Sequence, residues 1–187
     1  MFVVDTNVLV YAANSSSPFH PACRKSLESW RRGSGAWYGT WSILYEFLRV
    51  TTHARVLSPP WTARQAWTFV ESLLASPGFG VLAATPRHAR VAAQVIREVP
   101  HLAGNLVHDA HTAILMREHG IRRIYTRDTD FHRFPFVVCV REHTIPSILD
   151  AFARRLGQSA ERELDTALEE VAKIASLRLH DRLEVPA

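Results

Sequence analysis

Two aspartates in this chain follow short runs of residues that form buried strands. Asp5 comes directly after Phe2–Val4, and Asp128 follows the run Arg123–Thr126. In an α/β sheet, ligands bind outside the carboxyl ends of the strands. Both aspartates are therefore candidates for one shared site. Asp5 is also a favourable helix N-cap, and its position alone does not decide between the two roles.

Helices supply two further acidic candidates. Asp109 lies in the first or second turn of a helix predicted at 105–120, beside small alanines that would let the helix approach the sheet. Glu46 lies on the flank of the apolar stripe of a helix predicted at 40–52, where it is either a solvated edge residue or an acid turned inward. Asp130, in the turn after the last strand-end aspartate, is either a further ligand or the cap of its own turn.

The chemistry of such a set is that of a metal site. Carboxylates in one cleft repel one another, and each raises the pKa of its neighbours unless a cation is present. Oxygen-only ligands favour the hard ions Mg²⁺ and Mn²⁺. A site of this kind polarises a phosphodiester, lowers the pKa of a bound water and stabilises the leaving oxygen. We therefore expect Asp5, Glu46, Asp109 and Asp128 to converge and to support phosphodiester hydrolysis.

The predicted elements alternate between strands and helices, which indicates a parallel sheet covered on both sides. The predicted strands are 2–4, 36–38, 79–82, 123–126 and 136–140. After a first helix that resumes the apolar period at Val8, the predicted helices are 21–32, 40–52, 62–75, 86–98, 105–120 and 145–156. The last strand is a continuous β-branched run, typical of a strand buried on both faces. Pro86 is expected at the first position of its helix.

Composition indicates an ordinary globular protein. The chain has 187 residues, of which 47% are hydrophobic and 21% charged, enough for one domain with a substantial core. No apolar run approaches the ~20 residues that span a bilayer, and no secretory signal opens the sequence, so we expect no membrane association. Cys23 and Cys139 lack zinc-ligand spacing. They are expected to be reduced thiols of a cytoplasmic protein.

Positive charge is concentrated in residues 1–150, which carry 16 basic and 11 acidic residues, whereas residues 151–187 carry 6 and 7. Arginine supplies nearly all of this charge, and its planar fork suits phosphate contacts, so a polyanionic partner is plausible. Residues 151–187 have an amphipathic helical period. This C-terminal helix should dock on the domain, on a second copy of the chain or on a partner, and the sequence leaves that choice open.

Four motifs in this order resemble the PIN-domain ribonucleases, most closely the toxin subunits of VapBC toxin–antitoxin pairs. They are VVDTNVLVYA at 3–12, SILYEFLRV at 42–50, HDAHTAIL at 108–115 and IYTRDTDFHRF at 124–134. The resemblance implies a Rossmann-like α/β PIN domain with a central parallel sheet flanked by helices, which we place at 1–150. The helical extension at 151–187 lies outside the family pattern. The resemblance also implies Mg²⁺- or Mn²⁺-dependent cleavage of RNA, a frequent homodimer and a cognate antitoxin that blocks the site.

By this resemblance the catalytic quartet is Asp5, Glu46, Asp109 and Asp128, and its three aspartates are the metal ligands. The residues expected to support the quartet are Thr126, Asp130 and Asn7. The candidates for RNA contacts are Arg127, Arg133, His108 and His111, with solvated or structural roles as the alternative. Four tryptophans, at 37, 41, 61 and 67, either stack on bases or pack in the core and grooves.

We therefore predict a metal-dependent endoribonuclease, the toxin of a type II toxin–antitoxin pair. Hydrolysis by in-line attack would leave a 5′-phosphate and a 3′-hydroxyl. One alternative is a catalytically silent RNA-binding or interaction module on the same fold, although such a module has no need to keep like charges together. Another is a housekeeping nuclease of RNA processing.

Overall fold

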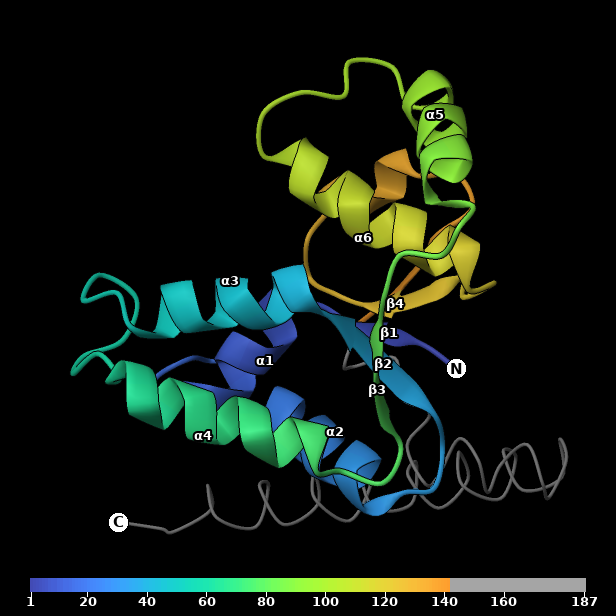
Figure 1. Cartoon of the computed structure of the whole chain (residues 1–187). Helices are drawn as coiled ribbons and strands as arrows, with labels where there is room; N and C mark the ends of the chain where they lie inside the picture. The colour runs from blue at the N-terminus through green and yellow to red at the C-terminus, as the bar shows by residue number, and fades with distance from the viewer. Residues whose placement is uncertain (142–187) are drawn as a thin grey trace, which may run out of the picture. The chain divides into compact units, whose positions relative to one another are not determined.

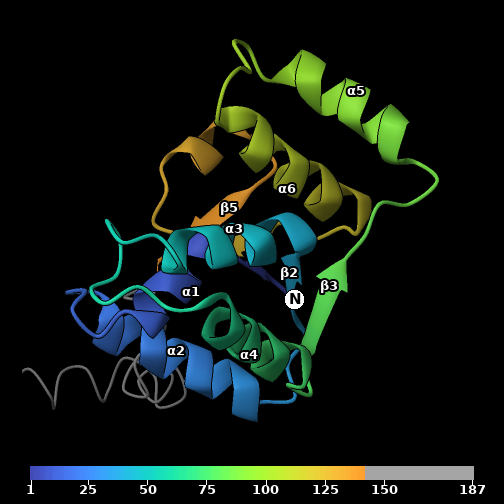
Figure 2. The ribbon, with the colours of Figure 1, turned by 60° about the vertical axis from the view of Figure 1, so that its left-hand side comes forward.

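The computed structural model describes residues 1–141. They form a five-stranded parallel sheet with the strand order β3-β2-β1-β4-β5 (Figures 1 and 2). The strands are β1 Val3–Val4, β2 Trp37–Thr40, β3 Phe79–Leu82, β4 Arg123–Tyr125 and β5 Val138–Val140. The predicted parallel α/β sheet is confirmed. The predicted helix at 145–156 and the extension at 151–187 lie outside the described residues.

Helices cover both faces of the sheet. They are α1 Thr6–Ala13, α2 His20–Arg32, α3 Trp41–Thr51, α4 Ala63–Leu74, α5 His88–Glu98 and α6 Leu106–Glu118, followed by the short 3₁₀ helix η1 Asp130–Arg133. In Figure 1, α5 and α6 lie on one side of the sheet and α1, α2 and α4 on the other. Among residues 1–141, no helix is long and apolar enough to cross a membrane.

The hydrophobic core contains one of the four candidate tryptophans. Trp37 in β2 is fully buried, and its ring packs against Trp30 and Phe79 with centroids 6.0 and 4.5 Å away. Trp61 is partly buried and makes an edge contact with the ring of Phe47, with centroids 6.0 Å apart. Burial of large apolar side chains is the main favourable term in folding. These two tryptophans therefore serve packing.

Strand β2 leads straight into α3 at the carboxyl edge of the sheet. Thr40 is the N-cap of α3, and its hydroxyl accepts a 3.2 Å hydrogen bond from the Ile43 amide. Such caps satisfy an amide that the first helical turn leaves without a partner. Helix α3 packs on α1 and also contacts α6. It thus starts beside the end of β1, where Asp5 lies.

Two local predictions are wrong. The run 136–140 is not a strand buried on both faces: only Val138–Val140 is a strand, it lies at the sheet edge, and Val138 is 46% exposed. A β-branched run does not reveal its place in the strand order, and that place decides burial. Pro86 does not open its helix either, because α5 begins at His88 with Arg87 as N-cap.

Candidate metal centre

Hydrogen bonds at Asp5 connect the carboxyl ends of β1 and β4. The Asp5 amide donates to the Tyr125 carbonyl over 3.0 Å, and the Thr126 hydroxyl donates to Asp5 Oδ2 over 2.6 Å. The other carboxylate oxygen, Oδ1, accepts a 2.7 Å bond from the Thr6 amide and so caps α1. Asp5 and Thr126 are both buried. Asp5 is therefore the N-cap of α1, and it lies where the carboxyl ends of β1 and β4 meet.

Asn7 and Thr126 order the turn that carries Asp128. The Asn7 amide nitrogen donates to Asp5 Oδ2 and to the Thr126 hydroxyl, the latter over 3.0 Å. Asn7 Oδ1 accepts from the Arg127 amide over 3.1 Å, and the Thr126 hydroxyl accepts from the Asp128 amide over 2.9 Å. These hydrogen bonds thus fix the backbone of the turn from which the Asp128 side chain extends. Asn7 and Thr126 therefore hold Asp5 and the turn of Asp128 together, and their supporting role in a metal site stays a prediction.

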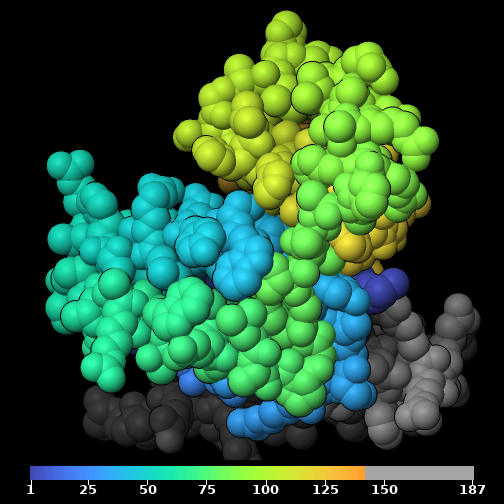
Figure 3. All heavy atoms as spheres, in the orientation of Figure 1, coloured from blue at the N-terminus to red at the C-terminus, as the bar shows by residue number. Residues whose placement is uncertain are grey.

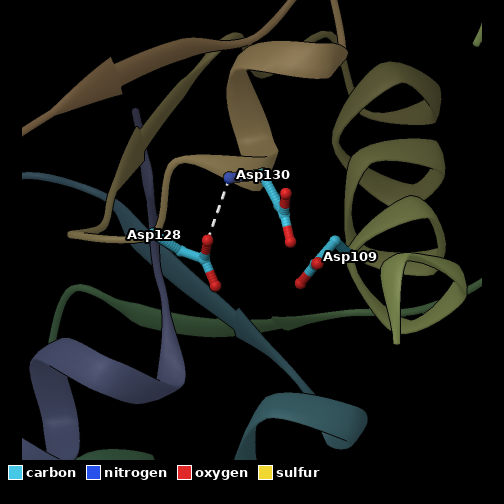
Figure 4. Close-up of side chains that lie close together, drawn as sticks. All are labelled: Asp109, Asp128 and Asp130. Atoms are coloured by element: carbon cyan, nitrogen blue, oxygen red, sulfur yellow. Dashed lines mark hydrogen bonds between the residues drawn. The ribbon is translucent and has the colours of Figure 1, made fainter. Parts of the chain in front are cut away.

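Three carboxylates come closest together. Asp109 in α6, Asp128 in the turn after β4 and Asp130 at the start of η1 each place one oxygen within 4.8 Å of the other two. Figure 4 shows the three side chains converging from two sides, with the Asp130 amide donating to Asp128 Oδ1 over 2.9 Å. Within residues 1–141, Asp5 and Glu46 are not members of this close group. The structure therefore brings Asp130 in with Asp109 and Asp128, and it leaves Asp5 behind the group with both oxygens hydrogen-bonded.

The pKa of Asp109 is affected by the charge of every other acid of the site. Burial, the largest cause, and the negative charges of Asp5, Asp128, Asp130 and Glu46, in that order, together raise the pKa of Asp109 from 3.8 to about 7. A divalent cation would relieve this repulsion, because three close oxygens with raised proton affinity are the ligands that hard cations prefer. The residues present therefore fit Mg²⁺ or Mn²⁺.

Asp5, which is outside the close group, also has a raised pKa. Burial, the largest cause, and the charges of Asp128 and Glu46 raise the pKa of Asp5. Hydrogen bonds from Thr126 and Thr6 favour its charged form, and the net value is about 6. Asp5 is therefore in electrostatic contact with the cluster without being one of its closest members.

Glu46 is directed toward α1 from a partly exposed position. Its Oε2 accepts a 2.9 Å hydrogen bond from the Thr6 hydroxyl, and its Oε1 accepts one of 3.0 Å from Arg49 Nη2. The side chain is 44% exposed. Sequence reasoning did not single out Thr6 or Arg49. The spacing of Arg49, three residues after Glu46 on a helix, was a signal that could have found it.

A cavity of about 900 Å³ contains the whole set. Its acidic lining residues are Asp5, Glu46, Asp109, Asp128 and Asp130. Helices α1, α3 and α6 supply most of the rest of the wall. In Figure 3 the surface is hollowed between α3, in cyan, and the segment leading into α6, in yellow-green. The five acids therefore line one shared cavity.

The candidates for RNA contacts differ in position. His108 is exposed and lines the cavity, whereas His111 lies 3.2 Å from the Ser42 hydroxyl at Nδ1 and its ring faces His88. Burial and the charge of His88 lower the pKa of His111. The guanidinium of Arg127 lies 3.6 Å from the centre of the Phe19 ring. His108 is therefore the candidate that faces the site, and His111 belongs to a helix contact.

Arg133 lies beside the close acidic group. Its Nε is 3.7 Å from Asp130 Oδ1, and its side chain is 53% exposed. Exposed ion pairs of this kind are weak. The Arg133 guanidinium is therefore accessible to a phosphate that approaches the cluster.

Comparison with known proteins gives consistent matches. The PIN domain family profile matches residues 2–137. The chain is 35% identical over 134 residues to Ribonuclease VapC48 of Mycobacterium tuberculosis, covering 70% of this chain and 89% of that protein. It is also 35% identical over 134 residues to Ribonuclease VapC37 of the same organism, covering 72% and 92%.

Solved structures share the fold. VapBC2 from Rickettsia felis, bound to a DNA fragment from its promoter, matches with a TM-score of 0.55 and 15% identity over 75% of this chain and 97% of that chain. The toxin VapC20 of Mycobacterium tuberculosis, which cleaves the sarcin–ricin loop, matches with a TM-score of 0.53 and 19% identity over 71% and 93%. At these identities the likeness establishes the fold alone.

Proposed function

The chain belongs to the PIN-domain family, and from that premise we propose that it is an endoribonuclease, the toxin of a type II toxin–antitoxin pair. The observation that carries this proposal is the approach of Asp109, Asp128 and Asp130 to within 4.8 Å of one another, in a cavity that Asp5 and Glu46 also line. The matched ribonucleases, at 35% identity, support RNA as the substrate. The fold alone does not imply this activity, so the proposal depends on the acidic set.

The cofactor in this proposal is a divalent cation, Mg²⁺ or Mn²⁺. Asp109, Asp128 and Asp130 would hold it, and Asp5 would act from behind the cluster through its charge and its bonds to Thr126. When bound, the cation supplies Lewis-acid polarisation of the phosphodiester and neutralises the gathered negative charge. Without that neutralisation the carboxylates would repel an RNA phosphate.

The chain's own residues position the reaction. Asn7 and Thr126 hold Asp5 and the Asp128 turn in one arrangement, which lowers the cost of ordering the site when RNA binds. Glu46, oriented by Thr6 and Arg49, would orient the attacking water in line with the leaving 3′-oxygen. Cleavage in this direction leaves a 5′-phosphate and a 3′-hydroxyl.

The partners are an RNA substrate, a cognate antitoxin and a second copy of the chain. Structures that match this fold include VapBC complexes, which supports the antitoxin. The place of action in this proposal is the cytoplasm, where cellular RNA is accessible. We place the nuclease domain at residues 1–150 and the extension at 151–187.

The test is to sequence the ends produced from total RNA by the purified full chain with Mn²⁺ and with EDTA. We expect new 5′-phosphate ends with Mn²⁺, none with EDTA and none with Asp109→Asn. RNA retention without new ends would instead support a silent binding module. Cleavage that persists in EDTA would remove the metal from the proposal.

A further inference from the structure

Helix α3 presents three residues in a line beside the acidic cavity. Trp41, Tyr45 and Arg49 are spaced four residues apart, so they share one face of the helix over about 12 Å of its length. We refer to these three residues as the α3 strip. Two aromatic rings followed by a guanidinium are the side chains that proteins use to stack bases and to contact phosphates.

The two aromatic rings are exposed although large apolar groups are favoured inside. Tyr45 is 59% exposed and Trp41 is 43% exposed. Their rings stack on each other, with centroids 5.8 Å apart and planes inclined by 28°. This mutual contact holds both rings in place while the outer ring surface of the pair remains open. A rigid, open aromatic surface can accept a base with little loss of side-chain entropy.

The strip is continuous with the site. Tyr45 and Arg49 line the same cavity as Glu46, which lies between them on α3, and as the close group that contains Asp109. A nucleotide stacked on Tyr45 would therefore place its neighbouring phosphates in the cavity.

Arg49 supplies positive charge to an acidic cavity. Among the described residues that line this cavity, it is the only lysine or arginine, against five acids. One of its nitrogens bonds Glu46 Oε1, and its side chain is 71% exposed. A guanidinium has five donors, so this single bond leaves others for a phosphate. An acidic or neutral peptide would gain less from this combination than a polyanion carrying bases.

We propose that the α3 strip is a binding site for single-stranded RNA, in which a base stacks on Trp41 and Tyr45 and an adjacent phosphate contacts Arg49. The proposal deepens the proposed endoribonuclease function and rests on it, because it names single-stranded RNA as the form presented to the acidic cluster. A duplex keeps its bases stacked on one another, so its interior bases are not free to lie on the strip.

The experiment measures stacking directly. A short single-stranded RNA that contains 2-aminopurine is titrated with the full chain carrying Asp109→Asn, so that no cleavage occurs during the measurement. We expect quenching of the 2-aminopurine fluorescence on binding. Adding Trp41→Ala or Tyr45→Ala should weaken binding by about 5- to 150-fold and remove most of the quenching.

Matched variants separate stacking from a general loss of structure. Tyr45→Phe keeps the ring and should keep the quenching. Trp67→Ala removes a tryptophan of α4, outside the strip, whose Nε1 bonds Glu71, and should leave binding unchanged. Arg49→Ala should weaken RNA binding and reduce the dependence of the affinity on salt concentration. Arg49→Lys should restore part of the affinity and part of the salt dependence.

Each outcome decides the proposal. Equal binding and quenching by wild type and Trp41→Ala, or equal affinity for the duplex of the same sequence, overturns the strip even if wild-type protein cleaves RNA with Mn²⁺. Conversion of a dimer to a monomer by Trp41→Ala, without any change in quenching, also overturns it and assigns the rings to a second copy. Stacking without cleavage by the metal-loaded wild type contradicts the proposed nuclease and leaves the RNA strip standing.

Discussion

The hydroxyl of Thr126 donates a 2.6 Å hydrogen bond to Asp5 Oδ2, although the two residues are 121 positions apart in the sequence. Thr126 is also an acceptor for the Asp128 amide, so one buried hydroxyl connects two acids of the site. Thr126→Val keeps the shape and removes these bonds. We expect activity with Mn²⁺ to fall by about 10- to 100-fold, as for other groups that orient a metal site. Thr126→Ser is the control and should retain most activity; equal loss in both would argue against the hydroxyl.

Asp5→Asn separates the two roles of Asp5. Asparagine is as good a helix N-cap as aspartate, so the variant should fold with an unfolding free energy within about 1 kcal/mol of the wild type. It lacks the negative charge behind the cluster, and we expect metal-dependent cleavage to be lost. Thermal unfolding and RNA cleavage, measured on the same preparation, check both parts. Unchanged cleavage would remove Asp5 from the mechanism.

The acidic cluster should make stability depend on pH and on the cation together. The pKa of Asp109 is raised from 3.8 to about 7, so the folded chain holds a proton there that the unfolded chain has released. Stability in EDTA should therefore fall as pH rises from about 4 to about 7. Mg²⁺ binds the deprotonated form and should raise the melting temperature more at pH 8 than at pH 5. An equal Mg²⁺ shift at both pH values would contradict this linkage, and Asp109→Asn should reduce the pH dependence.

Glu118 is a buried acid that stabilises the fold away from the site. The Glu118 side chain has no exposed surface; its oxygens accept bonds of 2.6 Å from the Thr85 hydroxyl and 3.2 Å from the Thr85 amide, and His88 Nδ1 lies 2.7 Å away. Burial alone would raise the pKa of Glu118, but these contacts hold it below 4.5. The stabilisation that ionised Glu118 gives to the fold is present above pH 4.5 and is lost as pH falls through the lowered pKa.

Glu118→Ala should therefore cost about 1 to 3 kcal/mol of unfolding free energy at pH 7, because it removes the hydrogen bonds of a buried carboxylate and leaves the partly buried Thr85 and His88 without this partner. Chemical denaturation at pH 7 and at acid pH measures both effects. The control is Glu98→Gln, which disrupts an ion pair of Glu98 with Arg117 between partly exposed side chains and should cost less than about 1 kcal/mol. Equal losses in the two variants would contradict the buried role of Glu118.

Sequence patterns predict the parts of the site that depend on strand ends. Asp5 and Asp128 follow short predicted strands, and parallel strands bring their carboxyl ends to one edge, so their convergence follows from local pattern and fold class. Asp109 is predictable for a related reason, since the alanines beside it indicate a helix close to the sheet. The structure brings these acids into one cavity.

Other features depend on contacts that no local pattern contains. Asp130 joins the close group because η1 begins at it, whereas the sequence indicates only a turn. The orientation of Glu46 toward α1 depends on the Thr6 hydroxyl, which reaches it from another helix. The place of β5 at the sheet edge depends on the order of all five strands. Each of these is decided by packing between distant segments.

The most direct test of the central claim, that distant acids meet to hold one divalent cation, is calorimetric titration of the full chain with Mn²⁺. Wild-type protein should bind Mn²⁺ with release of protons near neutral pH, because the carboxylates with raised pKa must deprotonate. Asp128→Asn, which changes an exposed side chain, should still fold and should lose most of this binding. Glu98→Gln should bind as the wild type does. Equal Mn²⁺ affinity in wild type and Asp128→Asn would contradict the claim.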